Sequence, residues 1–127
     1  MNHLFDTHGT APNLKTGPAA ALQVAHQALL AGMPQGEVEL RVITGKVEPG
    51  ERTPKHSHRF PVIVYVLAGA FSIDLQDGRT LSAKTGEVMI EPPHLAMTGY
   101  NPLPAETARL VMFYASEPGT PFADIVS

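Results

Sequence analysis

The sequence predicts an all-β domain, either a barrel or a sandwich of about seven to nine short strands. Twelve prolines and eleven glycines are spread over the 127 residues, and such frequent turn residues favour short strands over long helices. Apolar residues alternate with polar ones in several segments, as they do on a strand with one buried face. At this length a single domain can bury a core of its own.

The strands are predicted in turn from residue 37 onward. In residues 37–42 the apolar side chains of Val38, Leu40 and Val42 alternate with charged ones, which indicates a half-buried strand. Residues 61–67 form an apolar run rich in β-branched side chains, as expected of a buried strand. The other predicted strands are residues 71–75, 80–83, 87–91 and 107–115, and residues 122–126 are compatible with an edge strand.

The clearest local prediction is a tight hairpin between residues 71–75 and 80–83. Asp77-Gly78 supplies two residues that tolerate positive φ, which the shortest hairpin turns require at both central positions. Residues 48–51, Glu-Pro-Gly-Glu, are predicted to form a further turn.

The first part of the chain is harder to interpret. Residues 1–17 show no period and are predicted to form an N-terminal arm, with residues 18–127 forming the single barrel domain. Residues 19–30 fit a helix ended by Gly32, or a strand around residues 22–25 followed by one helical turn. Helix propensity favours the first alternative, whereas a barrel favours the second.

Composition excludes several classes of function. Nine basic residues against twelve acidic ones give a net charge of -3, so nothing predicts binding to nucleic acid or to an anionic membrane. The chain has no cysteine, which excludes disulfides, thiol nucleophiles and thiolate metal sites. The apolar stretch at residues 19–31 is interrupted by polar residues and is too short to cross a bilayer. We therefore expect a cytoplasmic protein without an export signal.

His56 and His58 form the candidate metal-binding pair. They are one residue apart, so on a strand both imidazoles project from the same face and can converge on one ion at about 2.0–2.1 Å. With six histidines in the chain, chance alone predicts about 0.3 such pairs, so the spacing by itself is weak evidence.

The residues around this pair resemble the two motifs of the cupin family. The resemblance spans residues 38–115, and it implies a double-stranded β-helix, the RmlC-like jelly-roll barrel, which is usually a homodimer and has a metal or ligand site in its open end. The first motif is matched by Gly50, five intervening residues, His56-Ser57-His58 and the run 62–69 that ends in Gly69, and the second by Gly86, residues 87–91, Pro92-Pro93 and Asn101.

The chain departs from the family's metal-binding pattern at two positions. The resemblance implies a glutamate in the first motif and a third histidine in the second, but Val62 and Met97 stand there. Two histidines are fewer than the three protein ligands usual for catalytic zinc or non-haem iron. His94, three residues before Met97, is the candidate third ligand if its loop shifts toward the pair.

Met97 allows two interpretations. Its thioether suits reduced copper more than harder ions, but an apolar residue filling the barrel wall explains it at least as well. Apolar residues near the pair predict a largely hydrophobic pocket around the site. The predicted pocket residues are Phe60, Val62, Tyr65 and Met97.

Three functions remain open on the sequence. The first is a metal-dependent enzyme of the oxygenase or isomerase type, in which a divalent transition metal (iron, manganese, zinc, nickel or copper) acts on a small organic substrate. The second is a metal-free barrel that binds or senses a small ligand, which the loss of the usual ligands at Val62 and Met97 favours. A scaffold role through dimerisation has no positive feature behind it.

Overall fold

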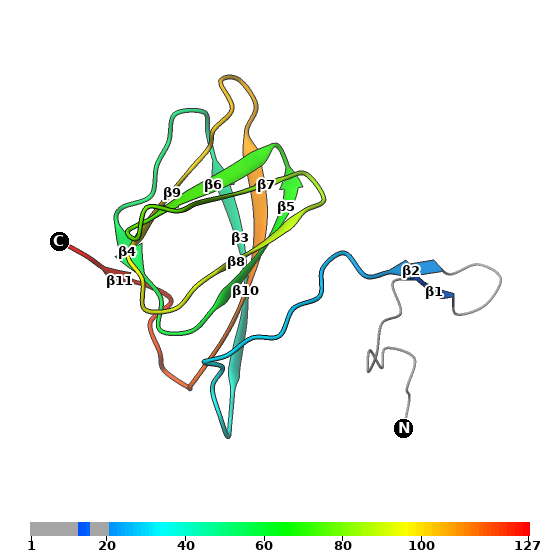
Figure 1. The fold of residues 1–127 in the computed structure, drawn as a ribbon, viewed down its shortest axis with the longest axis vertical. Helices are drawn as coiled ribbons and strands as arrows, with labels where there is room; N and C mark the ends of the chain where they lie inside the picture. The colour runs from blue at the N-terminus through cyan, green and yellow to red at the C-terminus, as the bar shows by residue number, and fades with distance from the viewer. Residues whose placement is uncertain (1–12, 16–20) are drawn as a thin grey trace.

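A computed structural model describes residues 13–15 and 21–127, and this part of the chain is all-β, as predicted (Figure 1). It contains eleven strands and no helix, so it holds no helical segment able to cross a membrane. The strands are β1 (Asn13–Lys15), β2 (Ala21–Gln23), β3 (Glu39–Val47), β4 (His56–Ser57), β5 (Val62–Ala68), β6 (Ala70–Leu75), β7 (Thr80–Lys84), β8 (Val88–Glu91), β9 (Met97–Tyr100), β10 (Ala108–Ser116) and β11 (Asp124–Ile125).

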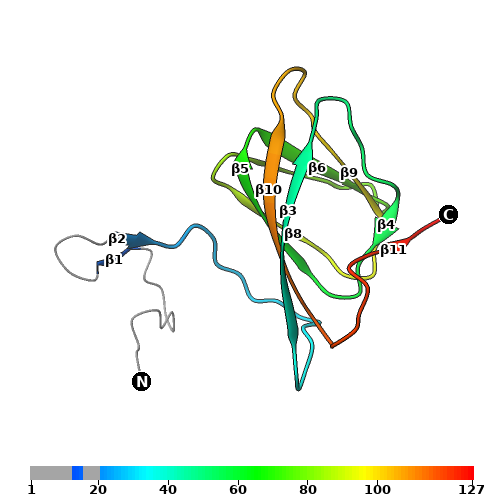
Figure 2. The same cartoon turned by 180° about the vertical axis from the view of Figure 1, so that it is seen from behind.

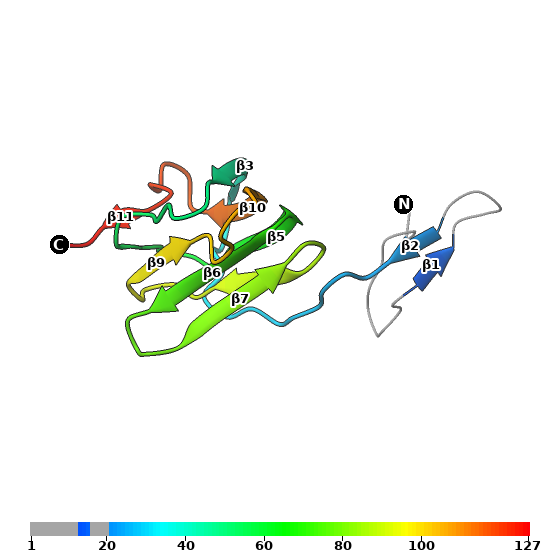
Figure 3. The same cartoon turned by 90° about the horizontal axis from the view of Figure 1, so that it is seen from above.

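Two antiparallel sheets form the barrel, and they face each other in Figures 2 and 3. The first sheet has the order β3-β10-β5-β8 and the second has the order β11-β4-β9-β6-β7. Strands that are neighbours in the sequence often lie in different sheets, as in a jelly roll. The β1–β2 hairpin forms a small sheet of its own, which projects beyond the barrel (Figure 1).

Residues between the two sheets form the hydrophobic core. Along β5, Val62, Val64 and Val66 are completely buried, whereas Leu67 on the opposite face is 51% exposed. Burying one such valine stabilises the fold by roughly 1.5–3 kcal/mol. The buried strand predicted from the β-branched run is therefore present, with only one face in the core.

The strand predicted around residues 37–42 is also present, but the face predicted to be buried is the exposed one. Its apolar residues Val38, Leu40 and Val42 are 45%, 64% and 59% exposed, respectively. Arg41 points inward, and its guanidinium donates hydrogen bonds to the hydroxyl of Ser116 and the carbonyl of Thr120. These polar partners explain why an arginine tolerates the inner face, which the alternation alone did not predict.

Two other local predictions need correction. The hairpin between β6 and β7 forms, but only Gly78 has positive φ, at 96°, and Asp77 does not. The amide of Gly78 donates to the carbonyl of Leu75, and the amide of Leu75 donates to that of Arg79, so the loop is longer than a two-residue turn. A type I turn followed by a left-handed glycine gives this pattern.

The helix favoured for residues 19–30 does not form in the described part of that segment. β2 covers residues 21–23, close to the strand of the second alternative, but irregular structure follows in place of the helical turn that this alternative included. Residues 24–30 lie against the outer face of β5 and β8, beside Ile63, Val88 and Ile90. The predicted arm, residues 1–17, lies outside the described residues except for 13–15.

Gly69, between β5 and β6, provides a test of this packing. It has φ of +76°, and an added Cβ would lie 2.7 Å from the carbonyl oxygen of Thr107. Gly86 has a similar φ of +84° but open space around it. We expect Gly69→Ala to lower the free energy of unfolding by at least about 1 kcal/mol more than Gly86→Ala, because only the first adds a clash to the backbone strain. Urea denaturation of both variants measures this, and equal losses would contradict it.

Candidate metal centre

A cavity of about 210 Å³ lies between the two sheets. Most of its wall is apolar, and its polar end is formed by His56, His58 and Glu91. The rest of the wall comes from Gly45, Lys46, Val47, Thr53, Phe71, Ile73, Gly99, Leu110, Met112 and Phe122. An apolar cavity with a few convergent polar groups is the usual form of a small-molecule site.

The two histidines are held by a very short strand. β4 pairs with β9 on one side, where His56 is opposite Met97, and with β11 on the other side. Because side chains alternate along an extended chain, His56 and His58 point to the same side. Their ring centroids are 4.9 Å apart and the rings are nearly perpendicular, at 80°. The predicted convergence of the pair is thus present in the geometry.

Hydrogen bonds to main-chain carbonyls orient both rings. Nδ1 of His56 lies 2.7 Å from the carbonyl oxygen of Pro54, and Nδ1 of His58 lies 2.6 Å from that of Phe122. A carbonyl can only accept a hydrogen bond, so the proton of each ring is on Nδ1. Each Nε2 is then left as the free nitrogen, which is the usual way a protein prepares a histidine to bind a metal.

Glu91 is the third member of this polar group, and sequence reasoning did not identify it. Its carboxylate Oε1 lies 3.0 Å from Nε2 of His58, and the two residues are only 3% and 1% exposed. One ligand atom from each of His56, His58 and Glu91 lies within 4.8 Å of the others. Small side-chain rotations from this spacing bring three ligand atoms to an ion bound at roughly 2.0–2.2 Å.

The contact between His58 and Glu91 requires a positive charge. With a proton on Nδ1 alone, His58 would present a lone pair to the carboxylate, and two acceptors at 3.0 Å would repel each other. Neither group can turn to water, because both are buried. A shared proton or a bound cation removes the repulsion. The donor set of two histidines and one carboxylate is one that zinc and non-haem iron use, so the residues fit a metal.

The register of the first sheet explains where the carboxylate comes from. Val62, at the position where the resemblance implied a glutamate, pairs directly with Glu91 across β5 and β8. The carboxylate is thus supplied by the neighbouring strand at the same level of the barrel. One signal in the sequence pointed to it: Glu91 alternates with Met89, so both belong to the buried face of β8.

The structure does not bring His94 to the pair. Its side chain is exposed, and its backbone has a φ of 62°, the only positive value for a non-glycine residue in the described part of the chain. The amide of His94 donates a hydrogen bond to the carbonyl of His58 at 2.7 Å. In this position His94 fastens the loop that precedes β9 to the histidine segment through its backbone.

The four predicted pocket residues do not line the 210 Å³ cavity. Val62 and Met97 are buried in the core, and Phe60 packs against that core. Tyr65 lies on the outer side of β5, near Gln23 and Ala25. The cavity wall comes instead from inward-facing positions of β3, β6, β9 and β10.

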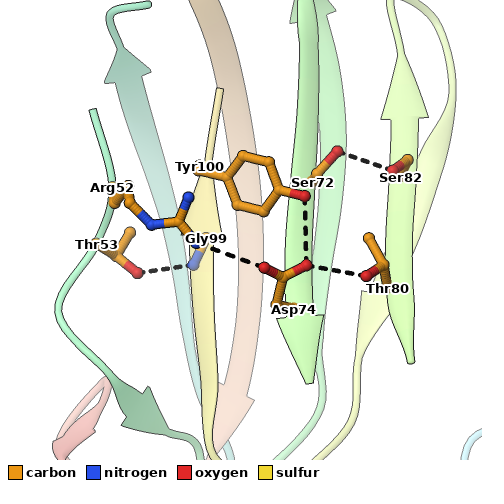
Figure 4. Close-up of polar contacts among 8 residues, drawn as sticks. All are labelled: Arg52, Thr53, Ser72, Asp74, Thr80, Ser82, Gly99 and Tyr100. Atoms are coloured by element: carbon orange, nitrogen blue, oxygen red, sulfur yellow. Dashed lines mark hydrogen bonds and ion pairs between the residues drawn. The ribbon is translucent and has the colours of Figure 1, made fainter. Parts of the chain in front are cut away.

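A network of polar contacts fastens the segment that leads to His56 (Figure 4). The backbone amide of Thr53 donates to the carbonyl of Gly99, and the amide of Gly99 donates back to the Thr53 hydroxyl, both at 2.8 Å. On the outer side of the same strands, Asp74 accepts hydrogen bonds from Arg52 and Tyr100, and the Arg52 guanidinium stacks on the Tyr100 ring at 4.5 Å. These contacts attach Arg52 and Thr53 to the second sheet, one on its outer face and one on its inner face.

The C-terminal strand lies beside β4, on the side opposite to β9. Phe122, whose carbonyl orients His58, is followed by β11, which pairs with β4. The guanidinium of Arg59 donates two hydrogen bonds to the carboxylate of Asp124, at 2.9 and 3.0 Å. Hydrogen bonds from Arg59 hold the pKa of Asp124 below its usual value. This ion pair is exposed, so it fixes the geometry of the segment more than it adds stability.

The chain belongs to the cupin family. The model of the cupin domain matches residues 43–114, more than half of the sequence, and the two facing sheets are those of the expected double-stranded β-helix. A comparison with curated proteins found no match.

Solved structures support the same fold. An RmlC-like cupin from Methanocaldococcus jannaschii has a TM-score of 0.56 and 20% identity, over 62% of this chain and 72% of the other. A cupin-like protein from Thermotoga maritima has a TM-score of 0.60 and 18% identity, over 80% and 90%. The polyketide cyclase RemF from Streptomyces resistomycificus has a TM-score of 0.58 and 27% identity, over 69% and 61%.

Acid is expected to release the C-terminal strand. Because the folded-state pKa of Asp124 is lowered, its ion pair with Arg59 contributes fully above the ordinary pKa of 3.8, and the contribution is lost as pH falls through the lower folded-state value. The Val126 amide, which donates to the carbonyl of Lys55, should then lose protection from hydrogen exchange after correction for the intrinsic rate. In Asp124→Asn this pH dependence should disappear, and an unchanged dependence would contradict the assignment.

Proposed function

We propose that the protein binds one divalent transition metal through His56, His58 and Glu91 and acts as a metal-dependent enzyme on a small organic substrate. The observation that carries this proposal is the convergence of His56, His58 and Glu91, whose ligand atoms lie within 4.8 Å of one another, with His58 Nε2 and Glu91 Oε1 in a buried contact of 3.0 Å. A cation bound by these atoms would form coordinate bonds to both and would compensate the buried carboxylate. The similarity to an enzyme, a polyketide cyclase, supports activity on an organic molecule.

The three ligands would leave coordination positions open toward the cavity. Iron, manganese, zinc, nickel and copper are all compatible with nitrogen and oxygen donors. When bound, such an ion polarises a substrate oxygen or activates dioxygen, which is the chemistry of isomerase and oxygenase reactions. The chain's own contribution is to hold two oriented imidazoles and a carboxylate at the end of an apolar cavity. Apolar walls limit water and strengthen electrostatic interactions within the site.

A metal-free binding barrel is the alternative function. The largely apolar wall of the cavity favours it, since such a wall suits a small ligand whether or not an ion is present. In that case a proton shared by His58 and Glu91 would take the place of the cation. Metal content distinguishes the two functions directly.

Single substitutions in the three ligands should abolish metal binding. We expect His56→Ala, His58→Ala and Glu91→Gln each to weaken affinity for the ion by at least about 100-fold, because each removes one of three protein ligands. Glu91→Gln is the sharpest variant, since its side-chain amide can donate to His58 Nε2 and keep the protein folded. Elemental analysis of tag-free protein, combined with thermal shift on metal addition, measures the effect.

His94→Ala is the matched control for this series. The exposed ring of His94 lies outside the group formed by the three ligands, so its removal should leave metal content unchanged. Metal lost with His94→Ala but retained with Glu91→Gln would reverse the assignment. Metal absent from the unaltered protein after exposure to all five ions would leave the binding barrel as the function.

We also propose that the chain forms a homodimer through the outer face of the first sheet. Val42, Phe113, Ile63 and Ile90 are paired in register and form one apolar row across all four strands. Residues 24–30 lie beside the β5 and β8 end of this row, whereas Val42 at the other end is 59% exposed. An exposed apolar row of this kind can be covered by the same row of a second copy related by a two-fold axis.

A charge placed in this row should separate the subunits. We expect Val42→Glu to shift the protein from dimer to monomer, because a carboxylate on the exposed part of this row would be buried in the contact without a partner. Size-exclusion chromatography with light scattering measures the mass. Gln76→Glu, in the exposed hairpin turn, is the control and should remain dimeric. A monomeric unaltered protein, or a dimeric Val42→Glu, would refute the proposed face.

A further inference from the structure

We infer that the ligand of the cavity is a single-ring aromatic acid of the benzoate class, with its carboxylate at the His56, His58 and Glu91 group and its ring between the two sheets. This inference rests on the proposed metal site and adds the chemistry of the ligand. Size, wall chemistry and charge each restrict the choice.

Size limits the ligand to one ring. The cavity has a volume of about 210 Å³. An apolar cavity of about 150 Å³ is large enough to hold benzene, so the space here accommodates one ring and a group the size of a carboxylate. Ligands of drug size need at least about 300 Å³.

The wall favours an aromatic ring. Phe71 and Phe122 contribute ring faces and edges, and Leu110 and Met112 contribute aliphatic and thioether surface. Phe122 also packs against His58, with ring centroids 4.8 Å apart. Aromatic pairs in such arrangements gain about 0.5–1.5 kcal/mol beyond their buried area, and methionine sulfur also prefers aromatic partners.

The net charge of the proposed metal site favours a ligand with an anionic group. Two neutral imidazoles, one carboxylate and a divalent ion would leave a net charge of +1 at the polar end of the cavity. Lys46, the other ionisable residue of the wall, is itself a cation and pairs with Glu48 at 3.4 Å, so it offers no neutralising charge. A carboxylate on the ligand neutralises the site and fills the open coordination positions.

Two glycines, one from each sheet, keep the cavity open. Gly45 is on β3, where an added Cβ would lie 3.4 Å from the Met112 methyl group, an ordinary contact. Gly99 is on β9, where a Cβ would lie only 2.5 Å from Cζ of Phe71 and would displace that ring. A Cβ at residue 45 therefore fits without a clash, and a larger side chain there would reduce the space for a ligand, which makes Gly45 the better position for a test.

The test is a calorimetric titration of the metal-loaded protein with benzoate. We expect benzoate to bind at least about tenfold more tightly than benzyl alcohol, its neutral analogue of similar size. Gly45→Val should weaken benzoate binding at least about tenfold, because an isopropyl group enters the space of the ring, and leave metal content unchanged. Thr44→Val is the matched control, since it adds a valine to the outer face of the same strand and should leave both quantities unchanged.

Each outcome separates this inference from the proposed function. Retained metal without benzoate binding, or equal affinity for benzyl alcohol, would overturn the ligand class and leave the metal site intact. Equal benzoate affinity after removal of the metal with EDTA would overturn the placement of the carboxylate at the ion. Failure to retain metal would refute the proposed function itself, and elemental analysis before the titration detects it.

Discussion

The site depends on one buried contact, in which Nε2 of His58 lies 3.0 Å from a carboxylate oxygen of Glu91. The fold fixes the position of both partners in this contact. The carbonyl of Phe122 fixes the proton of His58 on Nδ1, and the register of β5 and β8 fixes the level of Glu91. Both partners are buried, so the fold itself keeps an imidazole nitrogen and a carboxylate together away from solvent. Such an arrangement persists only when a positive charge compensates it or when the rest of the fold outweighs its cost.

The ligands come from both sheets. His56 is on β4 of the second sheet, whereas Glu91 is at the end of β8 in the first sheet. An ion bound by all three residues would therefore link the two sheets across the cavity. Any ligand that binds only the folded state stabilises it, and here that stabilisation would act on the distance between the sheets, which also sets the volume of the cavity.

Local patterns in the sequence were enough for most strands of the barrel and for the histidine pair, but they did not predict β9. The alternation of β6, the β-branched run of β5 and the Gly78 turn each depend on neighbouring residues. Glu91 could not be assigned a role in the same way, because its proximity to His58 depends on which strand lies beside β5. The inward orientation of Arg41 likewise depends on Ser116 and Thr120, more than seventy residues away in the chain.

The departures from the family pattern can be understood in the same physical terms. A metal site requires donor atoms at fixed points in space, and it does not specify which strand supplies them. Val62 and Glu91 are register partners, so moving the carboxylate from β5 to β8 keeps a donor on the cavity wall while a valine fills the core at its former position. The second departure has no such replacement among the described residues. Met97 stays in the core and His94 stays exposed, so the histidine implied for the second motif is not restored, and an ion bound by the other three residues would have one more coordination position available to a ligand.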